Sequence, residues 1–543
     1  MKRNMMKTRI MITLCTVVGF FSCTDLSDDV YSEITQDSFS KNPTAIKLIV
    51  GDAYAGVNLW VASSNPNWTP FYYNIATADE MIIPLRKITN EWKAPQVAEM
   101  YQHSWNANTT FLKDNWDRCF QIISKANFAI DQVNSFTSLG EDVRKAIVAE
   151  LRMIRAYGYY NVIDLWGDVP FTVSFTDKQS DILKKTSAEI YKFMIGEFEE
   201  CLPLLSKDTK SGYGKFNYYA ALALKAKYLI NANVFLDVER NDFTYPYEME
   251  GLDECISTCD EIIQHGGYSL EQDYFANFKV SNENSTENIL VIPFDQSYST
   301  NNTNVFGFGY ARHALHVSQA EAYNASCIGT AAVFQNGWSC LPSMYHSFMT
   351  GDVRRDGWLV GLQTYNGVPL KCKYPVNKDK NLDFTVDWTI QTCNEADGAR
   401  FIKYEYEKGL ISNSMNNDFV VIRLADIMLT KAEAIMRKNG GVATTEALRI
   451  VNDVRNRSFQ NAALHDYYTL SNLNMDALLN ERKLEFYGEG FRRTDLIRFH
   501  KFINGSWENL GKKTNEPPYL TVFPIPQAYL ETAPNIEQHA YYK

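Results

Sequence analysis

One stretch, KAIVAELRMIRAYGYYNVIDLWGDVP at residues 145–170, constrains the fold more than any other part of the chain. Apolar residues and one glycine recur in it at steps of three and four, namely Ile147, Leu151, Ile154, Gly158, Val162 and Leu165. This spacing places them on one face of an α-helix, which must bury that face against other elements. Gly167 and Pro170 follow and predict where the helix stops. A long amphipathic helix of this kind favours a helical architecture.

Similar patterns predict further helices in the first half of the chain. They lie near residues 112–133, 186–204, 216–237 and 249–264, with short connections between them. Paired helices of this size resemble tetratricopeptide-like repeats, although no strict repeat period can be read from the sequence. We therefore predict a mainly α fold of tetratricopeptide-like helix pairs.

The middle of the chain, residues 265–415, is rich in Gly, Asn, Ser, Thr and aromatic residues. The segment ENILVIPF predicts a short buried strand, whereas STNNTNVFGFGYARH and NKDKNLDFTVDW predict long loops. Long irregular stretches inside a globular protein are usually functional. Helices return at VVIRLADIMLTKAEAIMRKNGG, where Gly440 and Gly441 predict a C-terminal stop. The predicted helix pairs are thus decorated by long loops and a few short strands.

The N-terminus has the layout of a secretory signal. It begins with basic residues and continues with an apolar core, residues 10–21, too short to span a bilayer as a stable helix. Ser22 and Cys23 end this core, and a polar, acidic segment follows. The layout resembles a bacterial lipoprotein signal, in which the cysteine becomes the acylated first residue. The alternative is an ordinary signal with a chance cysteine, since Phe20 stands where lipoprotein signals usually carry Leu or a similar aliphatic residue.

The composition disfavours a nucleic-acid partner. The 543-residue chain has 53 Lys and Arg against 64 Asp and Glu, a formal net charge of −11. Removal of the predicted signal would make the charge more negative still, whereas a nucleic-acid partner calls for a basic face. Of the ten cysteines, Cys255 and Cys259 are the one close pair. We interpret them as buried free thiols rather than half of a zinc site.

The segment NERKLEFYGEG contains three glutamates that could serve a glycoside hydrolase. Glycoside hydrolysis needs two carboxylates that face one sugar, and Glu481, Glu485 and Glu489 lie four residues apart. They could share a helix face. Basic residues surround them, however: Arg482, Lys483, Arg492, Arg493 and Arg498. We therefore interpret the segment as a salt-bridge network that braces a helix.

Other catalytic and cofactor motifs do not occur in the sequence. It has no HExxH, no GxSxG and no GxxxxGK[ST] motif, and GFGYAR at Gly307 lacks the third glycine of a dinucleotide loop. His313 and His316 are three residues apart, but no carboxylate cluster with metal-ligand spacing lies near them. We predict no cofactor, no metal site and no catalysis.

Four stretches, in order along the chain, resemble the SusD/RagB family of outer-membrane, nutrient-binding lipoproteins. They are the lipoprotein-like start at Cys23, LRMIRAYGYYNVIDLWGDVPF, VVIRLADIMLTKAEA and LLNERKLEFYGEGFRRTDLIRF, and FPIPQAYLETAPNIEQ matches the family's usual close. The resemblance implies a helical fold with four tetratricopeptide-like helix pairs and no enzymatic activity.

The same resemblance implies partners and a location. The channel partner would be a TonB-dependent outer-membrane channel of the SusC type, on which the protein sits as a lid. The ligand would be an oligosaccharide or polysaccharide, although some relatives take peptides. The protein would be lipid-anchored at Cys23 in the outer membrane and would face the outside.

The resemblance also suggests a division of the chain. Residues 1–22 would be the lipoprotein signal peptide and residues 23–40 an acidic tether. Residues 41–240 would form the N-terminal SusD-like helical region, and residues 241–543 the C-terminal RagB/SusD region with irregular loops. No linker of biased composition separates the last two, so we predict one compact body.

Two loops offer candidate ligand contacts, because a sugar ring needs an aromatic plate and a few hydrogen-bonding groups. The first, DEMIIPLRKITNEW, offers Arg86, Asn90 and Trp92. The second, CIGTAAVFQNGWSCLPSMY, offers Asn336 and Trp338. In relatives, loops at these places often supply ligand contacts.

Each of these residues has a plainer interpretation. Trp92 and Trp338 could be packing residues, and Arg86 could be a solvated charge. Trp105 and Trp166 are assigned to the core. Two other functions also stay open: a surface-anchored glycan-degrading enzyme and a purely structural helical-repeat adaptor.

Overall fold

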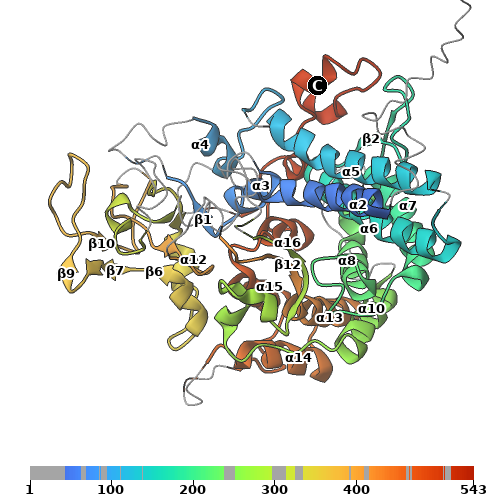
Figure 1. Ribbon diagram of the computed structural model, residues 1–543. Helices are drawn as coiled ribbons and strands as arrows, with labels where there is room; N and C mark the ends of the chain where they lie inside the picture. Colours follow the sequence, from blue (N-terminus) through green and yellow to red (C-terminus); the bar gives the residue numbers. More distant parts are fainter. Residues whose placement is uncertain are drawn as a thin grey trace, which may run out of the picture.

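The computed structural model has a helical part and a loop-rich part (Figure 1). It describes residues 43–543 except 63–68, 85, 87–94, 111, 137, 238–250, 296, 298–313, 325–333, 391–392, 409–414, 460–463, 465–466, 506 and 508–514. The predicted signal peptide and tether lie outside the described residues. Long helices dominate the right-hand side of Figure 1, and the short strands β6, β7, β9 and β10 lie on the left. The mainly α fold with loops and few short strands is therefore confirmed.

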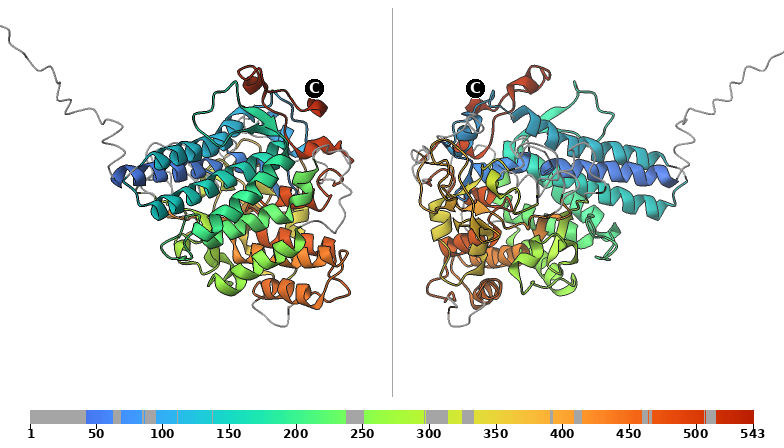
Figure 2. Two further views of the ribbon diagram at one scale, coloured as in Figure 1. Left: turned by 90° about the vertical axis from the view of Figure 1, so that its right-hand side faces the viewer. Right: turned by 60° about the vertical axis from the view of Figure 1, so that its left-hand side comes forward.

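The first half of the chain supplies a layer of long helices. These are α2 (Pro43–Val57), α5 (Leu112–Ser135), α6 (Glu141–Trp166), α7 (Ser187–Cys201), α8 (Tyr218–Ile230) and α10 (Leu252–His265). Helix α2 packs on α5 and α6, α6 on α7, and α8 on α10. Both views of Figure 2 show α2, α5 and α6 side by side. The helices predicted near 112–133, in 145–170 and near 249–264 are all present.

The second half adds helices on the far side of α10. Helix α13 (Leu424–Lys438) packs on α10 and on α14 (Thr445–Asn456), followed by α15 (Met475–Phe486) and α16 (Arg492–Arg498). Helix α13 ends as predicted, because Gly440 and Gly441 both have positive φ angles, at 65° and 85°. Shorter helices complete the set: α3 (Pro70–Ala76), α4 (Pro95–Tyr101), α9 (Ala232–Leu236), α12 (Pro342–His346) and α17 (Gln527–Leu530).

One predicted helix is broken. The pattern over 216–237 predicts one helix, but α8 and α9 meet at Asn231. The Asn231 side chain donates from Nδ2 to the carbonyl oxygen of Lys227 at 2.8 Å and accepts from Arg498 at 2.9 Å. An asparagine that bonds locally to the backbone competes with helix continuation. The single-helix prediction is therefore wrong at this point.

The strands of the described residues form short antiparallel pairs. They are β1 (Met81–Ile82) with β5 (Ser339–Cys340), β2 (Val169–Phe171) with β3 (Leu183–Lys185), β4 (Asn288–Ile292) with β12 (Phe419–Arg423), β6 (Trp358–Leu359) with β11 (Arg400–Phe401), β7 (Gly361–Leu362) with β10 (Asp383–Phe384), and β8 (Thr364–Tyr365) with β9 (Val368–Pro369). Every residue of β4 is buried, as ENILVIPF predicts. Strand β12 is buried as well, and it occupies the VVIR start of the segment predicted as a helix, so that prediction is wrong up to Arg423 and α13 begins at Leu424. Phe419 lies opposite Ile292, and Arg423 opposite Asn288.

A hydrophobic core runs through the helical part and under the loops. It includes Trp105 and Trp166, as predicted. Cys255 and Cys259 are buried free thiols, again as predicted. Within the described ranges no helix is both long and apolar enough to cross a membrane.

Candidate functional site

The two segments predicted to contact a ligand lie side by side. Strand β1 pairs with β5, so that Met81 lies opposite Cys340 and Ile82 opposite Ser339. The chain leaves β1 toward Arg86 and enters β5 from Asn336. Because the pair is antiparallel, both residues lie at the same end of it.

Arg86 cross-links three segments. Its Nε donates to the carbonyl oxygen of Asn336 at 3.0 Å, and one Nη donates to Ser339 Oγ at 2.5 Å. The other Nη donates to the carbonyl oxygen of Asp397 at 2.9 Å. The side chain is buried, so the solvated-charge interpretation of Arg86 is wrong.

Asn336 is the second residue of this cluster. Its φ angle is 53°, in the left-handed region that asparagine adopts more readily than most residues. Its side-chain oxygen accepts from Arg400 at 2.7 Å, and its Nδ2 donates to the carbonyl oxygen of Glu395 at 2.8 Å. Arg400 is fully buried and also donates to Ser339 Oγ at 3.0 Å. We call Arg86, Asn336, Ser339, Asp397 and Arg400 the loop base.

In the loop base, the buried guanidinium groups of Arg86 and Arg400 donate hydrogen bonds to uncharged oxygen atoms. Among the residues that the structure describes, neither Arg86 nor Arg400 forms an ion pair within 4.0 Å with a carboxylate. Burial, together with the charge of Arg86, lowers the pKa of Arg400 well below its usual value. Carbonyl groups with two lone pairs satisfy such donors only in a fixed geometry. The loop base is thus a rigid anchor for the chain segments that leave it.

Trp338 packs in the core beneath this anchor. The side chain is 1% exposed, and its ring centroid lies 5.4 Å from that of Tyr72. A ring buried in this way offers no face to a ligand, which supports the packing interpretation. The burial of Arg86 and Asn336 likewise argues against direct ligand contact and for a role in holding the loops.

Asn90 and Trp92 lie outside the described residues, so their predicted ligand contacts stay a prediction. They follow Arg86 by four and six residues.

Sequence reasoning missed Ser339, Asp397 and Arg400. The one local signal is Gly398, whose φ angle is 85° and whose added Cβ would approach Ser339 Cβ to 2.6 Å. A glycine at such a place indicates a close approach of two segments. It does not say which segments meet.

His316 has a structural role. Its Nε2 lies 2.9 Å from Glu395 Oε1, and both side chains are fully buried. Burial lowers the pKa of His316 in spite of that carboxylate. His313 is outside the described residues, and among those described no group of three or more His, Cys, Asp or Glu side chains could hold a metal ion.

The three glutamates considered as hydrolase candidates all form ion pairs with basic side chains. Glu481 pairs with Arg354 at 2.7 Å and Arg455 at 2.6 Å, and Glu489 pairs with Lys403 at 2.7 Å. Glu485 accepts from Arg354, Arg423 and Arg457. We call Glu287, Arg354, Arg423, Arg457, Glu481, Glu485 and Glu489 the charge network.

The environment of Glu485 does not suit general acid catalysis. Burial alone would raise its pKa, but Arg457, Arg423 and Arg354 outweigh burial and hold the pKa well below its usual value. A general acid needs a raised pKa. The predicted ion pairing of these glutamates is confirmed, but none of these ion-pair partners is one of the basic residues that surround them in sequence, because all come from segments other than α15 and α16.

The three glutamates do not share a helix. Helix α15 ends at Phe486, and Glu489 follows between Gly488 and Gly490, whose φ angles are 71° and 84°. A Cβ on Gly488 would approach Phe401 Cε2 to 2.3 Å. The expectation of one shared helix face is wrong, because the glycines turn the chain toward Arg423 and Lys403.

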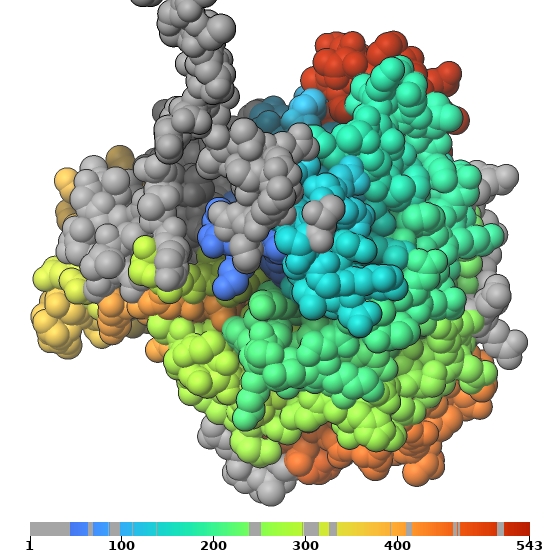
Figure 3. Space-filling view, turned by 45° about the vertical axis from the view of Figure 1, so that its right-hand side comes forward, coloured from blue at the N-terminus to red at the C-terminus, as the bar shows by residue number. Residues whose placement is uncertain are grey.

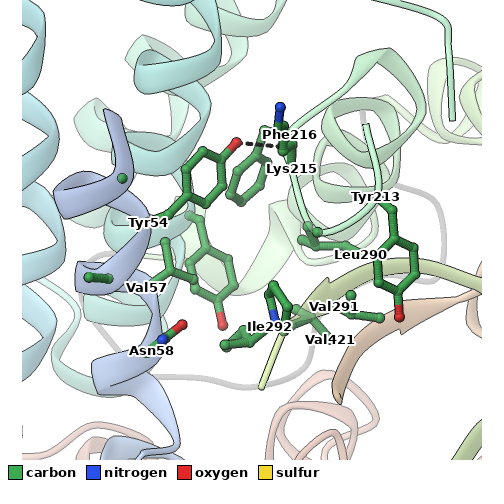
Figure 4. Close-up of a pocket in the computed structure, with 15 residues that line it drawn as sticks. Tyr54, Val57, Asn58, Tyr213, Lys215, Phe216, Leu290, Val291, Ile292 and Val421 are labelled. Atoms are coloured by element: carbon green, nitrogen blue, oxygen red, sulfur yellow. Dashed lines mark hydrogen bonds between the residues drawn. The ribbon is translucent and has the colours of Figure 1, made fainter. Parts of the chain in front are cut away.

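An apolar pocket of about 330 Å³ lies elsewhere, between α2 and strands β4 and β12 (Figure 4). Tyr54 and Val57 face Leu290, Ile292 and Val421 across it. Of the three tyrosines among its described lining residues, Tyr54 and Tyr213 have hydroxyls that are already hydrogen-bonded. That of Tyr54 donates to Glu150 at 2.6 Å and accepts from the backbone N–H of Phe216 at 2.8 Å.

The second rim tyrosine of this pocket, Tyr213, donates to Asp418 at 2.6 Å. The pocket walls therefore offer few free groups to sugar hydroxyls. This chemistry fits a carbohydrate poorly, in contrast to the loops that leave the loop base.

Two sequence profiles match the chain. The profile of the SusD family matches residues 398–542, and one described as starch-binding associating with outer membrane matches residues 29–229. They lie in different halves of the chain, and residues 230–397 between them are matched by neither profile.

Curated relatives align over most of their length. SusD-like protein P25 of Formosa agariphila is 25% identical over 452 residues, which are 78% of this chain and 77% of that protein. The starch-binding protein SusD of Bacteroides thetaiotaomicron is 23% identical over 521 residues, 87% of this chain and 86% of that protein.

Solved structures show the same fold. Surface glycan-binding protein A from Bacteroides thetaiotaomicron, in complex with laminarihexaose, superposes with a TM-score of 0.71 at 18% identity. The superposition covers 91% of this chain and 99% of that one. A laminarin-binding SusD-like protein gives a TM-score of 0.70 at 17% identity, over 92% and 99% of the two chains.

Proposed function

The chain belongs to the SusD family, and on this premise we propose that it captures oligosaccharides at the cell surface and delivers them to a TonB-dependent channel of the SusC type. The observation that carries the proposal is the pair of profile matches, one in each half of the chain, to a family whose relatives are named for glycan binding. The ligand class is an oligosaccharide or polysaccharide.

The geometry supports binding without catalysis. Glu481, Glu485 and Glu489 are locked by arginine and lysine side chains, so none is free to protonate a glycosidic oxygen. The loop base, in contrast, is a rigid anchor for two segments predicted to reach a ligand. A pre-organised anchor lowers the entropy that ordering the loops would otherwise cost on binding.

The channel partner and the lipid anchor complete the proposal. An acylated Cys23 would hold the protein in the outer membrane beside its channel. A tethered receptor works at high effective concentration, so a dissociation constant between about 1 µM and 1 mM is sufficient. The described part begins at Pro43, so a tether would join the body at the start of α2.

A glycan panel tests the proposal. The purified protein is incubated with neutral and charged polysaccharides, binding is measured by affinity gel electrophoresis and calorimetry, and products are sought by chromatography. Binding without product is the expected result. Product formation would instead favour the surface-anchored glycan-degrading enzyme, and lack of binding to any glycan would leave the structural adaptor.

Delivery needs its own measurement. The protein and a co-expressed SusC-type channel are purified from detergent-solubilised outer membranes through a tag on the channel. We expect the protein to elute with the channel. Elution of the channel without it would contradict delivery and leave glycan binding intact.

A further inference from the structure

A groove of about 390 Å³ lies on the outer face of α5. One side of it is formed by residues 172–182, which join β2 to β3 and which we call the strap. The other side is formed by α17. None of its lining residues belongs to the loop base.

The strap is held at both ends. Asp131 accepts from the backbone N–H of Phe175 at 3.0 Å, near the C-terminal end of α5. At the other end, Asn535 Nδ2 donates to the carbonyl oxygen of Ile182 at 2.6 Å. Figure 3 shows the strap and the C-terminal segment next to each other at the top of the molecule. The groove is therefore formed before any ligand arrives.

Helix α5 presents two rows of side chains to the groove. Trp116, Phe120 and Ser124 recur every four residues, and Asp117 and Gln121 lie beside them. Residues four apart lie on the same face of a helix. The rings of Trp116 and Phe120 thus lie beside the hydrogen-bonding groups of the other three residues.

Aromatic rings stand along the groove. Trp116 is buried and backs Phe120, at a centroid distance of 4.5 Å, and Tyr529, at 5.0 Å. The ring of Phe175 is 53% exposed and touches Phe128 edge-on at 5.1 Å. Because the strap holds this residue in place, its exposed ring is available to stack on the face of a sugar.

The groove is elongated. The α5 residues that line it run from Trp116, which touches Tyr529, to Asn127, eleven positions further along the helix. Eleven residues of helix span about 16 Å at about 1.5 Å per residue. This length suits a chain of several sugar rings better than a single ring.

The lining also indicates the charge of the ligand. Of the described residues that line the groove, Asp117 and Asp177 carry carboxylates and none is Lys, Arg or His. A sulfated or uronic-acid glycan would meet repulsion there, at a cost that rises as the pair is desolvated. Ring faces beside amides and hydroxyls fit a neutral glycan.

We propose that the α5 groove is a second glycan-binding site, which takes a neutral oligosaccharide segment. The proposal rests on the proposed glycan-binding function. Two sites on one protein would hold one polysaccharide chain at two points and raise its avidity without tighter contacts at either.

A pair of matched variants tests the site. Phe175 and Phe193 are both exposed phenylalanines, and each makes an edge-on contact at 5.1 Å and 74°. Only Phe175 lines the groove. We expect Phe175→Ala, and separately Gln121→Ala, to weaken retention by laminarin or soluble starch about tenfold, the loss of roughly 1.4 kcal/mol. Phe193→Ala should retain wild-type binding, and all three should melt like the wild type.

Hydrogen exchange with the same polysaccharides locates the contact directly. We expect the wild-type protein to gain protection in residues 172–182. If the wild type binds a neutral glycan but the strap gains no protection and Phe175→Ala binds normally, the second site is wrong and the proposed function stands. Binding of alginate alone would also overturn the neutral site. Binding of no glycan at all would overturn both proposals.

Discussion

Arg86 donates from Nε to the backbone carbonyl of Asn336 at 3.0 Å across 250 positions of sequence. This one contact joins two loop segments that the sequence alone suggests as ligand-binding. It therefore fixes the point from which both loop segments leave β1 and β5.

Replacement of Arg86 tests this anchoring role. We expect Arg86→Lys to lower the free energy of unfolding by about 3 kcal/mol, because one ammonium cannot serve the carbonyls of Asn336 and Asp397 and Ser339 Oγ together. Urea denaturation measures the change. Arg449→Lys is the control, since Arg449 is an exposed residue paired with Asp453. Equal stability of the two variants would contradict the anchor.

The charge network makes a second prediction. We expect Glu485→Gln to lower the free energy of unfolding by about 3 kcal/mol, because it removes a buried carboxylate that Arg354, Arg423 and Arg457 share. Glycan binding by the folded protein should not change. The measurements are urea denaturation and calorimetry. Hydrolytic activity in the parent that this variant abolishes without unfolding would show instead that Glu485 is catalytic.

Glu80 predicts a pH dependence of stability. Burial, helped by the charge of Asp79, raises its pKa from 4.5 to about 8, although Arg492 acts in the opposite sense. The folded state therefore keeps a proton that the unfolded state releases, and stability is lost as the pH rises from about 4.5 to about 8. A glutamine mimics the protonated form, so we expect Glu80→Gln to match the wild type near pH 5 and to exceed it by a few kcal/mol near pH 9.

The neighbouring residue, Asp79, is expected to have the opposite pH dependence of stability and serves as the control for this pH series. Burial acts to raise the pKa of Asp79, but Arg492 outweighs it and lowers that pKa. Asp79→Asn should therefore destabilise the protein above about pH 4. Thermal melts across the pH range separate the two. Parallel curves for Glu80→Gln and the wild type would contradict a protonated Glu80.

The two tryptophans of the predicted loops should behave differently. Trp338→Ala removes a core side chain that is 1% exposed, so we expect a loss of about 3–5 kcal/mol in stability. Trp92→Ala should leave stability unchanged and weaken glycan binding about thirtyfold, since an indole that covers roughly 80 Å² of sugar contributes about 2 kcal/mol. Calorimetry and melts check both. Normal binding by a stable Trp92→Ala would remove Trp92 from the site.

The anchor prediction concerns Cys23. We expect Cys23→Ala to stop partitioning with outer membranes when no channel partner is present, because the acyl chains are lost. Fractionation with a salt wash measures this. Retention of the variant in the membrane fraction after the wash would contradict acylation of Cys23 as the membrane anchor.

The sequence indicates helices well where one face is continuously apolar, as in α5, α6 and α10. It fails at Asn231, whose side chain bonds both to the local carbonyl of Lys227 and to Arg498 of α16. The apolar pattern continues through Asn231 and contains neither contact. The same holds for Glu489, which two glycines remove from α15.

The candidate site was harder to predict for a related reason. Arginine is rarely buried fully, so a sequence that shows Arg86 in a loop favours solvent or ligand as its partner. Its actual partners are backbone carbonyls from two distant segments. The mistaken expectation for Arg86 does not affect the selection of the two loop segments, because the pairing of β1 with β5 brings both segments to one place.

The charge network has a consequence for the order of folding events. Three arginines hold Glu485: Arg354 lies in η8 (Val353–Gly357), Arg423 lies in β12, and Arg457 follows α14. The network therefore closes only when these segments have assembled. We expect the pairs that join Glu485 to Arg354 and Arg423, 131 and 62 positions away, to be incomplete in the transition state of folding, because closing such long loops costs entropy first. Interactions absent from the transition state slow unfolding rather than speed folding. On this expectation the buried ion pairs prolong the lifetime of the folded chain.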